Sequence, residues 1–287
     1  MPFPKKKLFF SAILMLSLLA VNAESTSSPL GDEESRIVEL NFTRHIDFPI
    51  PMPVQDVYIV LNGSRPDLVY RATPEQAMDP KILALEAYAT VNHTPHDPLM
   101  ETENPIGPFP RGDDLGFTLG EWLAARGEGT YLEEDGNSTM DLVFWNLIPN
   151  GTYTVWWAGV THEPYRFAVA PAGAANGSDN WFKADSTGNG SFHANMQPLP
   201  PGSNETRTLI VVRYQSDGIV PGSSPGPYGK TAHVQLLYRM PLREMIKKEN
   251  ESIPISQAEE MQPGLGCIMA LGGILSAAFL ITLRRRG

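Results

Sequence analysis

The chain has a single cysteine in its 287 residues, Cys267, which lies inside an apolar run near the C-terminus. The long stretch between the two ends therefore has no disulfide bond to stabilise it, unlike many small secreted domains. A blue-copper site is also excluded, because it needs a cysteine thiolate beside its histidine ligands. Cys267 itself is expected to act as a small apolar residue.

Several motifs typical of enzymes are absent too. There is no G-x-S-x-G nucleophile elbow, no P-loop and no dinucleotide-binding fingerprint. Positive charge is also scarce, since residues 24–262 hold 16 Lys and Arg against 32 Asp and Glu. This excess of negative charge argues against nucleic acid or an anionic lipid surface as a partner. We therefore expect a protein that is not an enzyme and uses no cofactor.

What the chain does have is a hydrophobic segment at its N-terminus. Three lysines at residues 5–7 precede an apolar run over residues 8–20, and residues 21–23 (VNA) fit the signal peptidase pattern. The run is shorter than the ~20 residues of a transmembrane helix. We expect residues 1–23 to be a signal peptide, cleaved after Ala23.

A second apolar segment closes the chain. Residues 264–283 are free of charge and long enough, as a helix, to cross the ~30 Å hydrocarbon core of a bilayer. The arginines that follow are expected to stay cytoplasmic. Residues 24–262 would then lie on the extracellular face of the cell membrane, held by lipid contacts of this helix. The C-terminus would be cytoplasmic unless the tail is processed.

The tail resembles the PGF-CTERM sorting signal of archaeal surface proteins. The matching residues are Pro263, Gly264, the apolar span, Arg284, Arg285 and Arg286. Leu265 stands where that family has phenylalanine. The resemblance covers residues 263–287 and implies cleavage near the motif by an archaeosortase, with transfer to a lipid. It implies nothing about the activity of the exported part.

Asparagine usage is the most informative count. Chance would place roughly two N-x-[ST] glycosylation sequons among 14 asparagines of this composition. The chain has nine: Asn41, Asn62, Asn92, Asn137, Asn150, Asn176, Asn189, Asn204 and Asn250. All lie between the two hydrophobic ends, which indicates an N-glycosylated exported domain. With the acidic charge, the missing disulfides and the tail, they indicate an archaeal envelope protein.

The patterns predict a mainly β fold, a β-sandwich-like domain with one short helix. Residues 36–43, 57–61, 68–72 and 231–238 fit strands, and residues 207–214 fit a central strand that is apolar on both faces. Residues 139–147 and 152–160 read as a β-hairpin around Asn150-Gly151. Residues 92–117 read as a long loop. A capping box at residues 118–121 predicts the helix, which buries Trp122 and stops at Gly127.

The expected organisation has six parts. They are a signal peptide (1–23), a disordered segment (24–35), an N-terminal β-rich part (36–128), a β-sandwich core (129–242), a polar stalk (243–262) and the transmembrane or sorting tail (263–287).

Three candidate sites remain open. His93, His96 and Asp97 could share a metal ion, although Pro95 prevents a helical ligand face and a solvated loop is the alternative. Trp156 and Trp157 are adjacent on a strand and so point to opposite faces; one of them, if exposed, could stack on a sugar. Ser216 and His233 could pair as nucleophile and base, although the Ser-Asp-Gly sequence is common in turns.

The sequence therefore predicts an exported, membrane-anchored surface glycoprotein that acts by binding or by structural presentation. Its processing partners would be signal peptidase and an archaeosortase. The alternatives are a metal-binding protein or enzyme that uses the loop at residues 93–97, and a carbohydrate-binding module that uses Trp156 or Trp157.

Overall fold

The computed structural model describes residues 35–48, 55–92, 94, 106–162, 165–200, 202–203 and 205–242. The expected signal peptide, stalk and C-terminal tail lie outside these residues, and so do the expected disordered segment up to residue 34 and the sorting motif from Pro263 to Leu265 with its three arginines. Within the described ranges, no helix is long and apolar enough to span a membrane.

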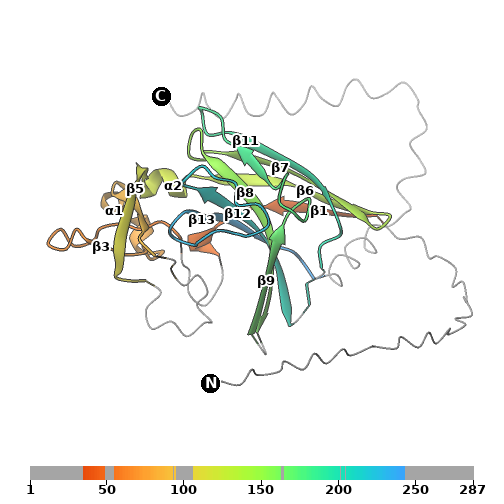
Figure 1. Cartoon of the computed structure of the whole chain (residues 1–287), viewed down its shortest axis with the longest axis horizontal. Coiled ribbons are helices and arrows are strands. Elements are labelled where there is room, and N and C mark those ends of the chain that lie inside the picture. Colours follow the sequence, from red (N-terminus) through yellow and green to blue (C-terminus); the bar gives the residue numbers. More distant parts are fainter. Residues whose placement is uncertain are drawn as a thin grey trace, which may run out of the picture. The chain divides into compact units, whose positions relative to one another are not determined.

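The described chain is mainly β, as predicted (Figure 1). Its strands are β1 (Arg36–Asn41), β2 (Thr43–Arg44), β3 (Leu68–Val69), β4 (Glu86–Thr90), β5 (Phe109–Thr118), β6 (Arg126–Glu134), β7 (Asn137–Trp145), β8 (Thr152–His162), β9 (Tyr165–Pro171), β10 (Trp181–Lys183), β11 (Gly190–Met196), β12 (Thr206–Gln215) and β13 (Ala232–Arg239). The helices are α1 (Pro80–Leu83), α2 (Leu119–Leu123) and the 3-10 turns η1 (His45–Asp47) and η2 (Gln76–Met78). The prediction of a single helix was therefore too low.

The strands form three antiparallel sheets. One has four strands in the order β1-β6-β7-β11, and a second has the order β10-β8-β12-β13-β2 with β9 also paired to β8. A small third sheet has the order β3-β5-β4. The N-terminal strands β1 and β2 pair with β6 and β13, and the expected boundary between residues 128 and 129 falls inside β6.

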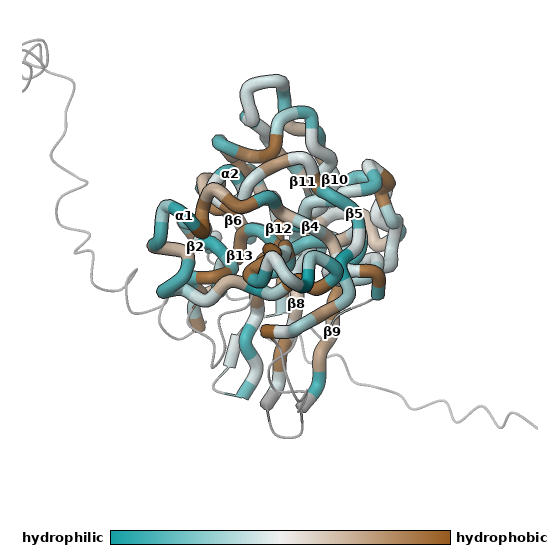
Figure 2. Tube along the Cα trace, turned by 90° about the vertical axis from the view of Figure 1, so that its left-hand side faces the viewer, coloured by the Kyte–Doolittle hydropathy of each residue, from teal (hydrophilic) through white to brown (hydrophobic). Residues whose placement is uncertain are grey.

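The two larger sheets share one hydrophobic core. Leu142 and Phe144 of β7 face Val155 of β8 and Ile210 of β12 in a single cluster of buried side chains. The ring of Phe182 stacks on Phe144 with centroids 5.1 Å apart. Each fully buried side chain of this kind stabilises the fold by about 1.5–3 kcal/mol. Figure 2 shows hydrophobic stretches running through β12 and β13 in the middle of the trace.

Strand β12 is central, as its two apolar faces predicted. It pairs with β8 along one edge and with β13 along the other. Ile210 and Val212 point into the shared core, while Val211 joins a separate cluster with Trp156 on the opposite face. A two-sided apolar sequence is what burial on both faces requires.

The predicted hairpin of residues 139–147 and 152–160 is wrong. Strand β7 pairs with β6 and β11, whereas β8 lies in the other large sheet. The connection crosses between sheets, with Asn146 and Asn150 in the left-handed conformation (φ 55° and 58°). The Tyr153 hydroxyl accepts the Ile148 backbone N–H at 2.9 Å and fixes this corner. The true hairpin is β6–β7, which turns at Asp135-Gly136.

The predicted loop over residues 92–117 is also wrong in its second half. Strand β5 occupies Phe109–Thr118 and pairs with β3 and β4. Only Phe117 of its ten residues is buried and its pairing with β4 is interrupted by register shifts, so no apolar alternation marks it in the sequence.

The helix at the capping box is confirmed, but its stop is not where it was expected. The Thr118 hydroxyl accepts the Glu121 N–H, and the Glu121 carboxylate accepts the Thr118 N–H at 2.7 Å. Trp122 is buried, as predicted. Helix α2 ends at Leu123, and Gly127 lies in β6, where a Cβ would overlap the Phe144 ring. Close packing therefore explains this glycine.

Candidate functional site

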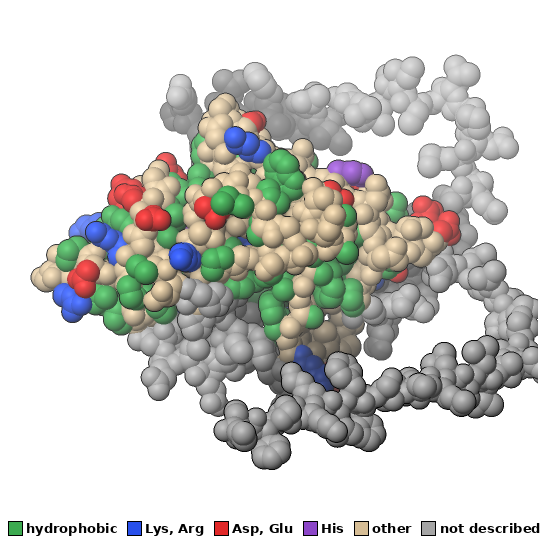
Figure 3. All heavy atoms as spheres, in the orientation of Figure 1, with side chains coloured by type: hydrophobic (Ala, Val, Ile, Leu, Met, Phe, Trp, Pro, Cys, Tyr) green, Lys and Arg blue, Asp and Glu red, His purple; other side chains and the backbone are tan. Residues whose placement is uncertain are grey.

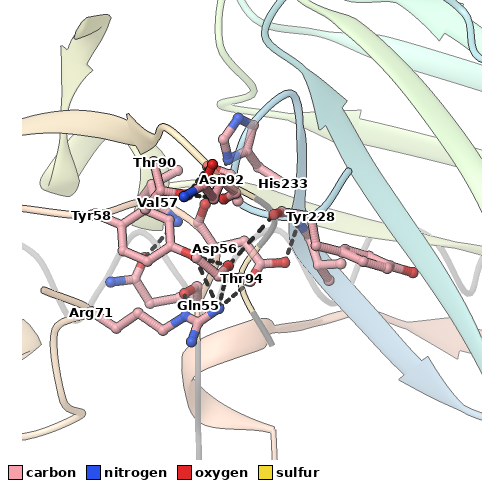
Figure 4. Close-up of polar contacts among 12 residues, drawn as sticks. Gln55, Asp56, Val57, Tyr58, Arg71, Thr90, Asn92, Thr94, Tyr228 and His233 are labelled. Atoms are coloured by element: carbon pink, nitrogen blue, oxygen red, sulfur yellow. Dashed lines mark hydrogen bonds and ion pairs between the residues drawn. The ribbon is translucent and has the colours of Figure 1, made fainter. Parts of the chain in front are cut away.

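A buried polar network lies where the small sheet meets β13 (Figure 4). Its side chains come from the segment before the Tyr58–Tyr88 bridge, from the chain just after β3, from Thr94 and from β13 itself. Asp56, Arg71 and His233 are each 0% exposed. Charged groups removed from water need partners within the protein. The hydrogen bonds of these three side chains therefore indicate the role of the network.

Arg71 is satisfied on every side. Its Nε donates to the Gln55 carbonyl at 2.9 Å, and its Nη2 donates to the Tyr58 hydroxyl at 2.9 Å and to Thr94 Oγ1 at 3.0 Å. Nη2 also lies 3.4 Å from Asp56 Oδ1, which supplies the opposite charge. The guanidinium lies 5.1 Å from the centre of the Tyr58 ring, which adds a cation–π contact.

Asp56 connects this pair to β13. Its Oδ2 accepts the Val234 backbone N–H at 3.1 Å, and its backbone carbonyl lies 2.6 Å from His233 Nδ1. A carbonyl can only accept, so Nδ1 carries the hydrogen. His233 Nε2 is then the acceptor for the Ser216 hydroxyl, 3.1 Å away.

The structure thus brings together Ser216 and His233, as the sequence hypothesis required. A half-buried hydroxyl that donates to a neutral imidazole is the arrangement in which a histidine can act as a base. The surrounding contacts favour a structural role. The Asp56 carboxylate, which would orient a catalytic imidazole, is bonded instead to Arg71 and Val234. Ser216 Oγ also lies 3.4 Å from the Thr231 carbonyl.

Burial lowers the pKa of His233 below its usual range, and this outweighs the opposing effects of the Asp56 carbonyl and of the Asp56 and Asp217 charges. In the unfolded chain the imidazole titrates near ~6.5. Below that pH the unfolded state binds a proton that the folded state does not, so the stability present at higher pH is lost as the pH falls.

We therefore expect the free energy of unfolding to fall by up to ~1.4 kcal/mol per pH unit below about pH 6.5. Urea unfolding at a series of pH values measures this slope. His233→Gln should flatten it, because the imidazole whose pKa burial lowers is then absent. Equal slopes in the wild type and in His233→Gln would refute this assignment.

A second buried basic side chain interacts with the charge of Asp56. Arg213 of β12 is 1% exposed and lies between the rings of Trp156 and Tyr228, at 4.9 and 4.8 Å. Its Nη1 donates a long bond to the Pro225 carbonyl, so it helps to hold the loop between β12 and β13. Burial lowers the pKa of Arg213.

The two tryptophans point to opposite faces of β8, as predicted. Trp156 is 0% exposed, so it is not available to stack on a ligand and the sugar-binding role suggested for it is corrected. Trp157 is partly exposed and packs against the edge of the shared core. Of the two, only Trp157 has an accessible ring.

The sequon asparagines that the structure describes all lie at the surface. These are Asn41, Asn62, Asn92, Asn137, Asn150, Asn176 and Asn189, and each is exposed. Asn180, which is not in a sequon, is 0% exposed. Asn204 and Asn250 lie outside the described residues.

His93, His96 and Asp97 also lie outside the described residues. Among the residues that are described, no group of three or more His, Cys, Asp or Glu could hold a metal ion. On the face drawn in Figure 3, side chains of both charges are scattered between polar and hydrophobic ones. A comparison with models of known families, with curated proteins and with solved structures gives no match.

Proposed function

We propose that this chain is an exported, N-glycosylated surface protein that is held at the outer face of the membrane and acts by binding or by structural presentation. The observation that carries the proposal is the set of nine sequons in a chain where chance would give about two. The surface position of every described sequon asparagine supports it, because a glycan needs a solvent-facing acceptor.

The fold is consistent with this proposal. We infer that the two larger sheets form a β-sandwich whose shared core stabilises the domain without disulfides. The polar network contributes by joining the small sheet to β13. Its buried charges are paired internally, so in this proposal they act in folding and not in catalysis.

The proposed anchor is the apolar tail with its PGF-CTERM-like motif. On this reading Pro263-Gly264-Leu265 marks a cleavage region for an archaeosortase, and the mature chain is attached to a lipid. The alternative is that the tail is not cleaved and holds the protein in the membrane as a transmembrane helix.

Intact mass spectrometry of the mature protein from native membranes tests the proposal. We expect a chain that begins at Glu24, is heavier than its peptide mass through glycans and has lost residues after the tail motif. A mass that equals the full unmodified chain would contradict export and glycosylation together. A C-terminus intact at Gly287 would contradict processing alone and leave the membrane anchor in place.

A further inference from the structure

An open hollow lies where the start of β7 and the end of β11 approach β8 and the chain after β9. Its volume is about 770 Å³, and pockets of about 300–1,000 Å³ hold small ligands. None of its 15 lining residues is charged, in a chain where charged residues make up 19%. A ligand suited to this hollow is therefore uncharged.

The lining combines an aromatic ring with amide groups. Trp157 is partly exposed, and Met196 lies beside it at the edge of the core. Asn195 and Gln197 are exposed in the same lining and carry side-chain amides. A sugar ring has an apolar C–H face that can stack on an indole and hydroxyls that can bond amides. This lining therefore fits a saccharide.

The walls are fixed before any ligand arrives. The Ser138 hydroxyl lies 3.2 Å from the carbonyls of Met196 and Gln197, which ties β7 to the end of β11. The Leu199 N–H donates to the Tyr131 hydroxyl at 2.8 Å. A preformed site loses less conformational entropy on binding than a flexible one.

The wall also contains a glycan acceptor, because Asn137 is both a sequon asparagine and an exposed lining residue. We propose that the glycan on Asn137 folds back into this hollow and stacks on Trp157. This inference rests on the proposed N-glycosylation. Tethering gives the sugars a local concentration of about millimolar or more, so a weak sugar–indole contact is sufficient to fill the hollow.

Asn41 provides a matched comparison. It lines a second hollow of about 520 Å³, together with Glu39, Glu128 and Asp141. The phenyl ring in that lining, Phe192, is 4% exposed and offers no face for stacking. A glycan on Asn41 is therefore expected to stay in solvent.

The test compares the full-length wild type with N137Q and N41Q, each expressed in an N-glycosylating archaeal host. Glycopeptide mass spectrometry reports occupancy, and hydroxyl-radical footprinting reports the exposure of Trp157. We expect the oxidation rate of Trp157 to rise several-fold in N137Q and to stay unchanged in N41Q. The unfolding midpoint should fall by about 2–4 °C in N137Q, and this fall should vanish when Trp157→Leu is already present.

Each other outcome is decisive. A glycan on Asn137 with equal Trp157 oxidation in the wild type and N137Q overturns the inference and leaves the proposed function intact. An empty Asn137 beside other occupied sequons does the same. An absence of glycan on every sequon overturns the proposed function as well. Saturable binding of a free oligosaccharide by the wild type, lost with Trp157→Leu, would assign the hollow to an external glycan and overturn the tethered one.

Discussion

Replacing Asp56 with alanine should destabilise the protein by about 3–5 kcal/mol, because it leaves a buried guanidinium without its counter-charge. The Asp56 and Arg71 side chains are both 0% exposed, and the Val234 N–H loses its acceptor in the same substitution. Urea unfolding of the purified protein, followed by tryptophan fluorescence, measures the loss.

Two further variants separate charge from hydrogen bonding. Asp56→Asn keeps an acceptor for the Val234 N–H but removes the charge and the oxygen that accepts from Arg71, so its loss should be smaller than that of Asp56→Ala. Adding Arg71→Met to Asp56→Asn removes both charges and should recover part of the stability. A double variant less stable than Asp56→Asn alone would contradict the view that the unpaired guanidinium dominates.

The exposed pair of Arg65 and Asp67 is the matched control. Its geometry is better than that of the buried pair, with two hydrogen bonds of 3.0 and 2.9 Å between the side chains. Both groups are solvated, and solvated ion pairs contribute little to stability. Asp67→Ala should therefore unfold close to the wild type. If Asp67→Ala and Asp56→Ala lowered the free energy of unfolding equally, burial would not be the reason that Asp56 stabilises the protein.

Features with local causes could be predicted from the sequence. The capping box needs only Thr118 and Glu121 three residues apart, and it is present as predicted. Consecutive apolar residues in β12 indicate burial on both faces of the strand. Its central position in the sheet was therefore also predictable. Neither depends on a distant partner.

Features that depend on distant partners could not be predicted. A turn at Asn150-Gly151 looks the same in sequence whether the next strand pairs back or crosses to another sheet, and here it crosses. Strand β5 lacks alternation because only one of its ten residues is buried, and its hydrogen bonds reach chain segments elsewhere in the sequence. Strand pairing determines both features, and the hydropathy pattern of the sequence carries no information about which strands pair.

The buried polar network was predictable from the sequence only in part. Asp56 and Arg71 each interrupt an apolar stretch, VQDVYIV and LVYRA, and a charge in such a stretch indicates a buried pair. The two residues are 15 positions apart, and this pattern could have predicted that they pair. The bond from Asp56 to Val234 spans 178 residues, and nothing in either segment indicates it.

Gly229 packs against this network and should tolerate substitution poorly. It has φ +74°, and a Cβ built there would overlap Thr94 Oγ1 and the Tyr58 hydroxyl, the two groups that hold Arg71. Its carbonyl accepts the Thr90 N–H at 2.8 Å, so the backbone cannot move away without breaking the contact between β4 and the loop before β13. Gly229→Ala should cost roughly 1–2 kcal/mol for the left-handed backbone and another 1–3 kcal/mol for the overlap.

Gly218 isolates the first of these costs. It lies at the other end of the same loop with φ +70°, and nothing lies within 4 Å of its Cβ position. Gly218→Ala should therefore lose only the backbone contribution, and the difference between the two variants in urea unfolding measures the overlap at Tyr58 and Thr94. If both variants lost the same free energy of unfolding, the side chains around Arg71 would be able to shift to accommodate an extra methyl group. The network would then be a loose contact and not the close packing that joins the small sheet to β13.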